Sequence, residues 1–312
     1  MKQIFVNLKR FEVSRSMGGL CPLDNPVIWI KSIIHQSIEL GMGRQQELSL
    51  VYILPEGLIT PACQALEEFS ETETGMISVG CQGVHWDNII AGKNFGAFTT
   101  VMPALAARNL GSRWALIGHS EERRFKQEII QAFEPSVIGI PALRAQAAAA
   151  INGLIHAEVK NALESGLNVL LCVGETADER GEGGFDEQQP RIKAILEQQL
   201  AANLDGLSEM LGDRRIVIGY EPVWAIGPGK TPPDRDYIRF VSTSIQDVVR
   251  QRFDSAITVV YGGGLKEENA AIIAGIETIG GGLVALTRFT GQIGFDVPGL
   301  KRIVDKYLAL ET

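Results

Sequence analysis

Apolar residues along this chain gather in short continuous runs that are separated by longer amphipathic stretches. Such runs predict buried β-strands, because strands of a parallel sheet covered on both faces are apolar throughout. The predicted strands are Gln3–Leu8, Leu48–Leu54, Met76–Cys81, Trp114–Ile117, Asn168–Val173, Arg215–Tyr220, Thr258–Tyr261 and Gly282–Ala285. Helical patterns lie between them, for instance Pro61–Phe69, Asn152–Ser165, Arg191–Leu211, Asp234–Arg252 and Pro298–Leu310.

This regular alternation of strand and helix predicts an α/β protein of the (β/α)8 barrel type, also called a TIM barrel. The chain has 312 residues, a length at which such barrels still form one domain, so we expect a single domain over 1–312. The alternative is a doubly wound open sheet. It would require a glycine-rich fingerprint after the first strand, and the segment Val6–Phe11 contains no glycine.

Composition narrows the possible partners. Hydrophobic residues make up 45% of the chain and charged residues 21%, as in an ordinary globular protein. The net charge of -8 argues against nucleic acid, so an anionic substrate must be attracted by local positive groups. The N-terminus lacks the apolar core of a signal peptide and no apolar run is long enough to span a membrane, so we expect a cytoplasmic location without membrane contact.

The chain has four cysteines, and their spacing matches no metal-binding motif. Cys21, Cys63, Cys81 and Cys172 are scattered along the chain, so we expect reduced thiols and neither a metal ion nor an organic cofactor.

Polar residues stand where predicted strands end, which is where barrel enzymes place their active sites. Asn7 and Lys9 close the first strand, and a period of two would direct both into the barrel mouth. His119 opens a helix after the fourth strand, and Glu221 ends the sixth. Each also has an ordinary interpretation: a solvated lysine, a structural histidine at a helix start, or an exposed carboxylate.

The stretch around Glu221 is the most informative. The segment Tyr220–Pro233 reads YEPVWAIGPGKTPP, in which a carboxylate on a strand end is followed by a proline and then by a glycine-rich flap. A base on a rigid strand beside a hinged flap suits proton abstraction in a pocket that closes over its substrate.

This stretch closely resembles the lid of the triosephosphate isomerase family. Further matches to that family follow in the same order along nearly the whole chain. They are VNLK at Val6–Lys9, CQG at Cys81–Gly83, GAFT at Gly96–Thr99, IGHSE at Ile117–Glu121, CVGE at Cys172–Glu175 and YGGG at Tyr261–Gly264.

The resemblance implies the catalytic roles. Glu221 is the expected base, and His119, kept neutral by the dipoles of the helix that follows it, shuttles a proton between two substrate oxygens. Lys9 binds substrate and stabilises negative charge, and Asn7 donates to the developing oxyanion.

The resemblance also implies supporting residues. Glu121 is expected to orient Lys9, Glu175 to hold the indole N–H of the lid residue Trp224, and Tyr261 to hydrogen-bond the closed lid. Glu128 matches a structural carboxylate of the family, and we expect it behind the site.

The phosphate site departs from the family. Gly227 and Gly264 match two of its backbone donors, although the second is usually serine. The family's Gly-Gly pair, which opens a short helix after the eighth strand, is replaced by Ala285 and Leu286, which keep the N–H groups but add side chains. Arg288 follows, either as a cationic clamp for phosphate or as a solvated arginine.

Three further departures change the active-site surroundings. Leu8 replaces the family's tryptophan, and insertions lie near 10–25 and 131–151. We expect the first insertion to reshape substrate access and the second to cover a sheet edge or to alter assembly.

The resemblance implies isomerisation of glyceraldehyde 3-phosphate and dihydroxyacetone phosphate through an enediolate. Two alternatives stay open: an isomerase of a four- or five-carbon ketose phosphate such as a tetrulose phosphate, and a barrel that binds a phosphorylated metabolite without turnover. We also expect a homodimer in which the loop containing Thr99 enters the partner's active site.

Overall fold

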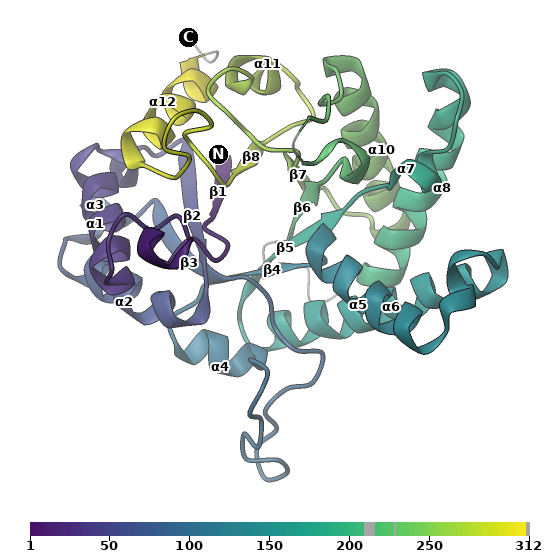
Figure 1. Cartoon of the computed structure of the whole chain (residues 1–312), viewed down its shortest axis with the longest axis horizontal. Helices are drawn as coiled ribbons and strands as arrows, with labels where there is room; N and C mark the ends of the chain where they lie inside the picture. The colour runs from purple at the N-terminus through teal and green to yellow at the C-terminus, as the bar shows by residue number, and fades with distance from the viewer. Residues whose placement is uncertain (209–215, 228, 310–312) are drawn as a thin grey trace.

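Eight parallel strands close into a barrel in chain order, with β8 pairing back to β1, in the computed structural model of residues 1–208, 216–227 and 229–309 (Figure 1). The strands are β1 Lys2–Asn7, β2 Leu48–Leu54, β3 Ile77–Cys81, β4 Trp114–Ile117, β5 Asn168–Val173, β6 Ile216–Tyr220, β7 Thr258–Tyr261 and β8 Gly281–Val284. The predicted (β/α)8 barrel is confirmed, and the open sheet is excluded because the sheet has no free edge.

The apolar runs predicted the strand bounds closely. β2, β4, β5 and β7 begin and end at the predicted residues, β3 and β6 begin one residue later than predicted, and β1 and β8 are shifted by one residue at both ends. Arg215, the predicted start of β6, lies outside the described residues.

Helices cover the outside of the barrel (Figure 1). The α-helices are α1 Pro26–Glu39, α2 Glu56–Glu67, α3 Glu71–Thr74, α4 Ala104–Asn109, α5 Ser120–Phe133, α6 Pro141–Glu164, α7 Ala177–Arg180, α8 Phe185–Leu204, α10 Arg235–Phe253, α11 Ala270–Ala274 and α12 Val297–Leu308. The short 3-10 helices are η1 Arg15–Met17, η2 Met42–Arg44, η3 Pro135–Ile138 and η4 Val223–Ala225.

The predicted helix bounds differ from the structure in several places, most of all at the starts of α2, α6 and α8, which lie before the predicted starts at Pro61, Asn152 and Arg191. Pro61 lies inside α2 and not at its start, because burial of Leu58, Ile59 and Ala62 stabilises the helix on both sides of the proline. α8 ends at Leu204, although the pattern predicted a helix to Leu211, whose own position lies outside the described part of the chain.

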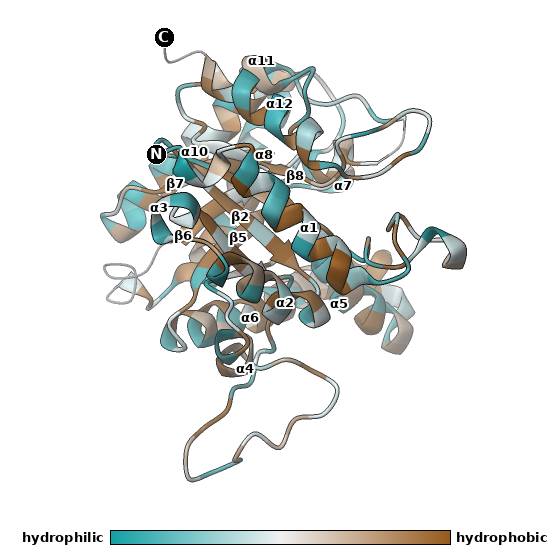
Figure 2. Cartoon of the chain, turned by 90° about the vertical axis from the view of Figure 1, so that its left-hand side faces the viewer, coloured by the Kyte–Doolittle hydropathy of each residue, from teal (hydrophilic) through white to brown (hydrophobic). Residues whose placement is uncertain are grey.

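The strands are apolar on both faces because one face lines the inside of the barrel and the other packs against the helices. Side chains such as Phe5, Trp114, Leu170 and Val260 fill the inside of the barrel. The alternate positions pack against the helices, and in Figure 2 the strands are brown while the helices around them carry both teal and brown. Polar residues therefore stand at the ends of the strands, beyond both apolar layers.

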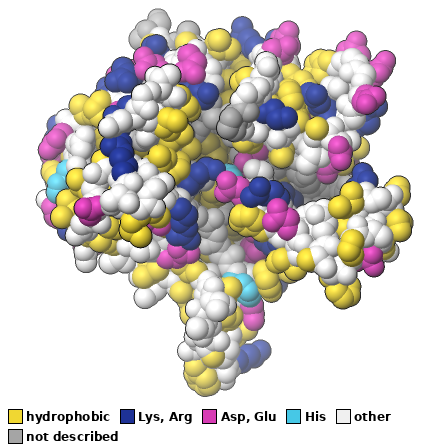
Figure 3. Space-filling view, in the orientation of Figure 1, with side chains coloured by type: hydrophobic (Ala, Val, Ile, Leu, Met, Phe, Trp, Pro, Cys, Tyr) yellow, Lys and Arg dark blue, Asp and Glu magenta, His cyan; other side chains and the backbone are white. Residues whose placement is uncertain are grey.

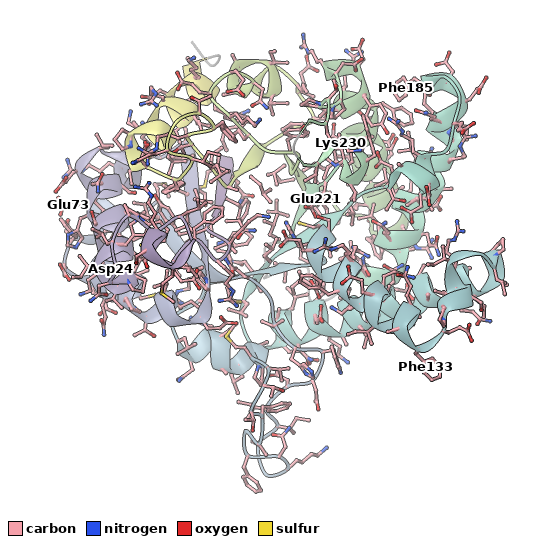
Figure 4. The ribbon with its side chains drawn as sticks, in the orientation of Figure 1. Asp24, Glu73, Phe133, Phe185, Glu221 and Lys230 are labelled. Carbon is pink, nitrogen blue, oxygen red and sulfur yellow. The ribbon has the colours of Figure 1, made fainter. Side chains whose placement is uncertain are left out.

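Two segments extend away from the barrel (Figure 1). One is the loop 82–103 between β3 and α4. The other is the second predicted insertion, in which the end of α5, η3 and the start of α6 carry exposed apolar side chains, with Phe133 89% exposed and directed outward (Figure 4). Because a closed barrel has no edge, the expectation that this insertion covers one is wrong.

All four cysteines are free thiols, and Cys21, Cys81 and Cys172 are buried. Among the described residues, none of the helices combines the length and the hydrophobicity that crossing a membrane would need.

Candidate active site

The strand ends bring Glu221, His119 and Ser120 together inside the ring of strands, where Figure 4 labels Glu221. Glu221 follows β6 directly and is 3% exposed. Its carboxylate accepts hydrogen bonds from the Ser120 backbone N–H at 2.9 Å and from the Ser120 hydroxyl at 3.0 Å. His119 Nε2 lies 3.3 Å from Glu221 Oε1. A buried carboxylate and an imidazole therefore face each other across the barrel mouth.

The position of His119 determines which ring nitrogen carries the proton. His119 caps the N-terminus of α5, and its Nδ1 accepts the Glu121 backbone N–H at 3.3 Å. A nitrogen that accepts a hydrogen bond carries no proton, so neutral His119 holds its proton on Nε2, toward Glu221.

Asn7 and Lys9 form the opposite wall with Gln82. Lys9 Nζ donates to Glu121 Oε1 at 2.8 Å, and hydrogen bonds from Gln82 Nε2 reach Asn7 Oδ1 at 3.2 Å and Lys9 O at 2.7 Å. Burial works against ionisation of Glu121, but its hydrogen bond with Lys9 and the lysine charge lower the pKa of Glu121. Lys9 and Glu121 are therefore a charged pair at the mouth.

The period-two argument for Lys9 is wrong. β1 ends at Asn7, and Lys9 has a left-handed backbone with φ 45°, stabilised by its N–H, which donates to Asn7 Oδ1 at 3.0 Å. This turn, and not strand alternation, directs the lysine toward Glu121.

A second carboxylate, Glu175, accepts hydrogen bonds from three side chains at the base of the lid. It is fully buried, and its Oε1 accepts from Trp224 Nε1 at 2.8 Å, Tyr237 OH at 2.7 Å and Tyr220 OH at 3.0 Å. Burial raises the pKa of Glu175, against the effect of these three donors. The Arg180 guanidinium lies 3.8 Å from the centre of the Trp224 ring. Trp224 is thus held from two sides.

Gly227 and Gly264, the glycines expected near the phosphate, both have a positive φ and free space where a Cβ would stand. Gly227 in the lid has φ 121°, a conformation that side chains rarely adopt, and a Cβ there would meet no neighbour. Gly264 follows β7, and the buried Tyr261 ends that strand. The Tyr261 hydroxyl lies where a Cβ of Gly263 would be, at 2.3 Å, so the tyrosine occupies space that only a glycine leaves.

The segment after β8 differs from the expectation of a short helix at the phosphate site. Residues 285–296 form a loop without a helix, in which Arg288 and Gly294 exchange backbone hydrogen bonds. Arg288 Nε lies 3.1 Å from Asp296 Oδ2, and Arg15 of the first insertion donates to Gln292 at 3.0 Å. Ala285 and Leu286 therefore do not open a helix, and Arg288 already has an acidic partner.

Glu128 is not behind the site, so that expectation is wrong. Its side chain is 57% exposed and pairs at 3.7 Å with Arg124 on the solvent side of α5. Half-buried Glu122 and Lys126 and buried Glu158 form a charged group beside Gly118 instead.

Sequence reasoning gave no role to Ser120 and Gln82, although both lie in matched motifs, GHSE and CQG. Their positions directly after strand ends were the available signal. Contact with Glu221 and Asn7 became visible only when separate strands were brought together.

No group of three or more His, Cys, Asp or Glu side chains within the described ranges is arranged to hold a metal ion. A groove of about 490 Å³ lies elsewhere, between α6, α8 and the end of α10. It is lined by Ala149, Gly153, His156, Gln198, Ala201, Ala202, Asp205 and Arg252, and so contains none of the predicted site residues.

Basic and acidic side chains alternate around the mouth (Figure 3). Lys9 there is paired with Glu121, and Arg288 with Asp296. Local cations are thus present despite the negative net charge, as an anionic substrate requires.

Comparison with known proteins agrees with this geometry. The family model described as triosephosphate isomerase matches residues 44–290. The triosephosphate isomerase of Alkaliphilus metalliredigens is 32% identical over 213 residues, which are 67% of this chain and 71% of that protein. The triosephosphate isomerase of Marinobacter nauticus is 31% identical over 261 residues, 81% of this chain and 86% of that one.

A solved structure supports the fold. The crystal structure of triosephosphate isomerase from Bartonella henselae superposes with a TM-score of 0.66 at 23% identity, covering 98% of both chains. The matched barrel, the facing carboxylate and imidazole, and the extent of the family match together show that this chain belongs to the triosephosphate isomerase family of aldose–ketose isomerases.

Proposed function

We propose that this enzyme interconverts glyceraldehyde 3-phosphate and dihydroxyacetone phosphate through an enediolate. The observation that carries the proposal is the 3.3 Å approach of His119 Nε2 to Glu221 Oε1 in a buried setting. A base and a proton-carrying electrophile at this distance can act on neighbouring carbon and oxygen atoms of one small substrate.

The proposed mechanism assigns one task to each group. Glu221 removes a proton from one carbon and returns it to the next. Neutral His119 donates its Nε2 proton to the developing oxyanion and recovers one from the adjacent oxygen. Lys9 and Asn7 stabilise the negative charge, which accounts for a lysine held in a left-handed turn at the barrel mouth.

The lid completes the site in this proposal. Trp224 is hydrogen-bonded to Glu175 and lies under the Arg180 guanidinium, and this arrangement is the open position of the lid. On closure, N–H groups of Gly227 and Gly264 reach the substrate phosphate, and Tyr261 receives the lid. Lid closure also excludes water from Glu221 and protects the enediolate from side reactions.

A four- or five-carbon ketose phosphate is the second candidate substrate. It is favoured by the loop after β8, where Ala285 and Leu286 add side chains and no helix N-terminus is formed. A phosphate displaced by Leu286 would lie farther from Glu221, which suits a longer carbon chain. Arg288 would bind that phosphate only by sharing or leaving Asp296.

A homodimer is part of the proposal. Loop 82–103, which contains Thr99, extends from the barrel (Figure 1), and Phe95 in it is 83% exposed. The loop begins at Gln82, which holds Asn7 and Lys9. A partner that immobilises this loop would therefore stabilise the catalytic wall.

Turnover measurements test the function directly. The purified chain should be assayed with glyceraldehyde 3-phosphate, dihydroxyacetone phosphate and tetrulose phosphates in parallel, each with a Glu221→Gln control. Triose turnover that this control abolishes would support the first candidate, and turnover of tetrulose phosphate alone would support the second. If no sugar phosphate is isomerised, the chain is a binding barrel and the mechanism is wrong.

A further inference from the structure

Gly118, the residue before His119, is held through both its N–H and its carbonyl by neighbouring side chains of α5. The Gly118 N–H donates to Glu122 Oε2 at 2.7 Å, and the Gly118 carbonyl accepts from Arg123 Nε at 2.9 Å. Gly118 has φ 73°, and a Cβ on it would lie 2.9 Å from Cys172 O. We call Gly118, Glu122 and Arg123 the Gly118 clamp. It fixes the backbone from which the His119 ring extends.

Both side chains of the clamp are anchored in turn. Arg123 donates to Asn152 Oδ1 at 2.9 Å and to Cys172 O at 3.1 Å, so it ties α5 to α6 and to the end of β5. Glu122 pairs with Lys126, and Lys126 Nζ donates to Glu158 Oε1 at 2.9 Å. The clamp is therefore part of the packed layer between helices and barrel.

The charges behind the clamp are balanced. Glu158 is 2% exposed, and burial together with the nearby Glu122 raises the pKa of Glu158, so it is protonated at neutral pH. Burial alone would raise the pKa of Glu122, but hydrogen bonding with Glu158, the Lys126 charge and the Gly118 N–H lower it. Ionised Glu122 thus accepts hydrogen bonds from the Gly118 N–H and from Lys126.

We propose that Glu122 is a positioning residue for the isomerisation: by holding the Gly118 N–H it keeps His119 Nε2 opposite Glu221. The inference rests on the proposed function. His119 makes its own contacts at 3.3 Å, through Nδ1 to the Glu121 N–H and through Nε2 to Glu221 Oε1. These are longer than the 2.7 Å bond of Glu122 to Gly118, so the backbone clamp and not the ring contacts determines where the imidazole lies.

Substitutions of Glu122 can separate the effect of side-chain length from the effect of side-chain charge. Glu122→Asp keeps the charge but withdraws the carboxylate from Gly118 by roughly 1 Å, a misplacement that can cost about 100-fold in rate. Glu122→Gln keeps the reach, and Glu158 can then ionise against Lys126 and preserve the charge balance. Glu122→Asn and Glu122→Gln make the same comparison without charge, should the aspartate variant not fold.

Steady-state kinetics are the first measurement. We expect Glu122→Asp to lower kcat by ~10–100-fold with KM within about threefold, and Glu122→Gln to lower kcat far less. Glu128→Asp, on the exposed side of the same helix, is the matched control and should leave kcat unchanged. The proposal is overturned if Glu122→Asp and Glu128→Asp have equal kcat, or if Glu122→Gln loses more than Glu122→Asp.

A second measurement needs no turnover. The chain has four histidines, so the imidazole ¹⁵N resonances can be assigned with a His119→Gln variant. Glu122→Asp should shift or broaden the His119 resonances, and Glu128→Asp should not. Unchanged His119 resonances in Glu122→Asp would also overturn the inference. A wild-type chain that isomerises no sugar phosphate would refute the proposed function alone, because the resonance comparison would still test the clamp.

Discussion

His119 Nε2 lies 3.3 Å from Glu221 Oε1, although the two residues are more than a hundred positions apart in the chain. Glu221 is meanwhile held by Ser120, the residue after the histidine. The start of α5 thus supplies both the proposed electrophile, His119, and the hydrogen-bond donors that hold the proposed base, Glu221. A substrate must enter between them and take over hydrogen bonds that the protein now makes with itself.

Shortening the base should reduce turnover much more than binding. In Glu221→Asp the carboxylate withdraws by about 1 Å, and misplacement of that order can cost roughly 100-fold in kcat. Steady-state kinetics with the preferred sugar phosphate would measure this, with KM expected to change little. A variant that isomerises near the wild-type rate would refute the role of Glu221 as base.

Removing the charge of Lys9 should affect both binding and the transition state. Lys9→Met keeps the length of the side chain but loses the cation that faces Glu121. Loss of one preorganised group that stabilises the oxyanion costs on the order of 10²–10³ in kcat, and KM should also rise. Glu121→Gln, which leaves the lysine in place, should cost less. Equal losses in the two variants would mean that the pair, and not the cation, matters.

The buried Glu158 should make stability depend on pH. Burial raises the pKa of Glu158 from 4.5 to about 9, with Glu122 adding to the rise and Lys126 opposing it. The native state therefore keeps a proton that the unfolded state loses above 4.5. The stability contributed by this group is complete below pH 4.5 and declines as pH rises toward 9, by at most about 1.4 kcal/mol per pH unit.

Glu158→Gln removes this titration, so its stability relative to wild type should improve steadily from pH 5 to pH 9. Urea denaturation at several pH values would measure the difference, with Glu128→Gln as an exposed control. A difference that stays constant with pH would show that Glu158 does not hold a proton in the native state.

Substrate choice should follow the loop after β8. Replacing Ala285 and Leu286 together by glycine removes the bulk near the phosphate, and should improve turnover of triose phosphates relative to tetrulose phosphates. Arg288→Ala should impair the native reaction if Arg288 leaves Asp296 to bind phosphate. Ratios of kcat/KM for the two substrates are the measurement. Wild-type triose turnover near the diffusion limit of about 10⁸–10⁹ M⁻¹s⁻¹ would contradict the idea of a longer substrate.

Assembly should depend on loop 82–103. Sedimentation of the wild-type chain should give twice the mass of one chain, and Phe95→Asp should shift it toward monomer and lower kcat, because Gln82 then loses support. Ile272→Asp is the control, because Ile272 is also an exposed apolar side chain but lies on α11, away from this loop and from both insertions. A wild-type monomer with full activity at nanomolar concentration would exclude the proposed dimer.

Much of the fold followed from the sequence because burial on both faces forces each strand to be an unbroken apolar run. The same logic located Asn7, His119 and Glu221, since polar groups can follow such runs only at strand ends. Helix bounds were less predictable, as at Pro61, because packing of an apolar face outweighs a local preference.

Contacts between distant segments were decided only by tertiary structure. The motif match pointed to Glu128, but the rotation of α5 against the barrel leaves that carboxylate in solvent and turns the half-buried Glu122 toward Gly118 and Lys126. Likewise Arg288 read as a free cation until the loop folded it against Asp296. The sequence by itself thus determined which chemical groups stand at the strand ends. Only the closed barrel determined which of them are paired, because a partner's identity depends on distances in space that the order of residues does not contain.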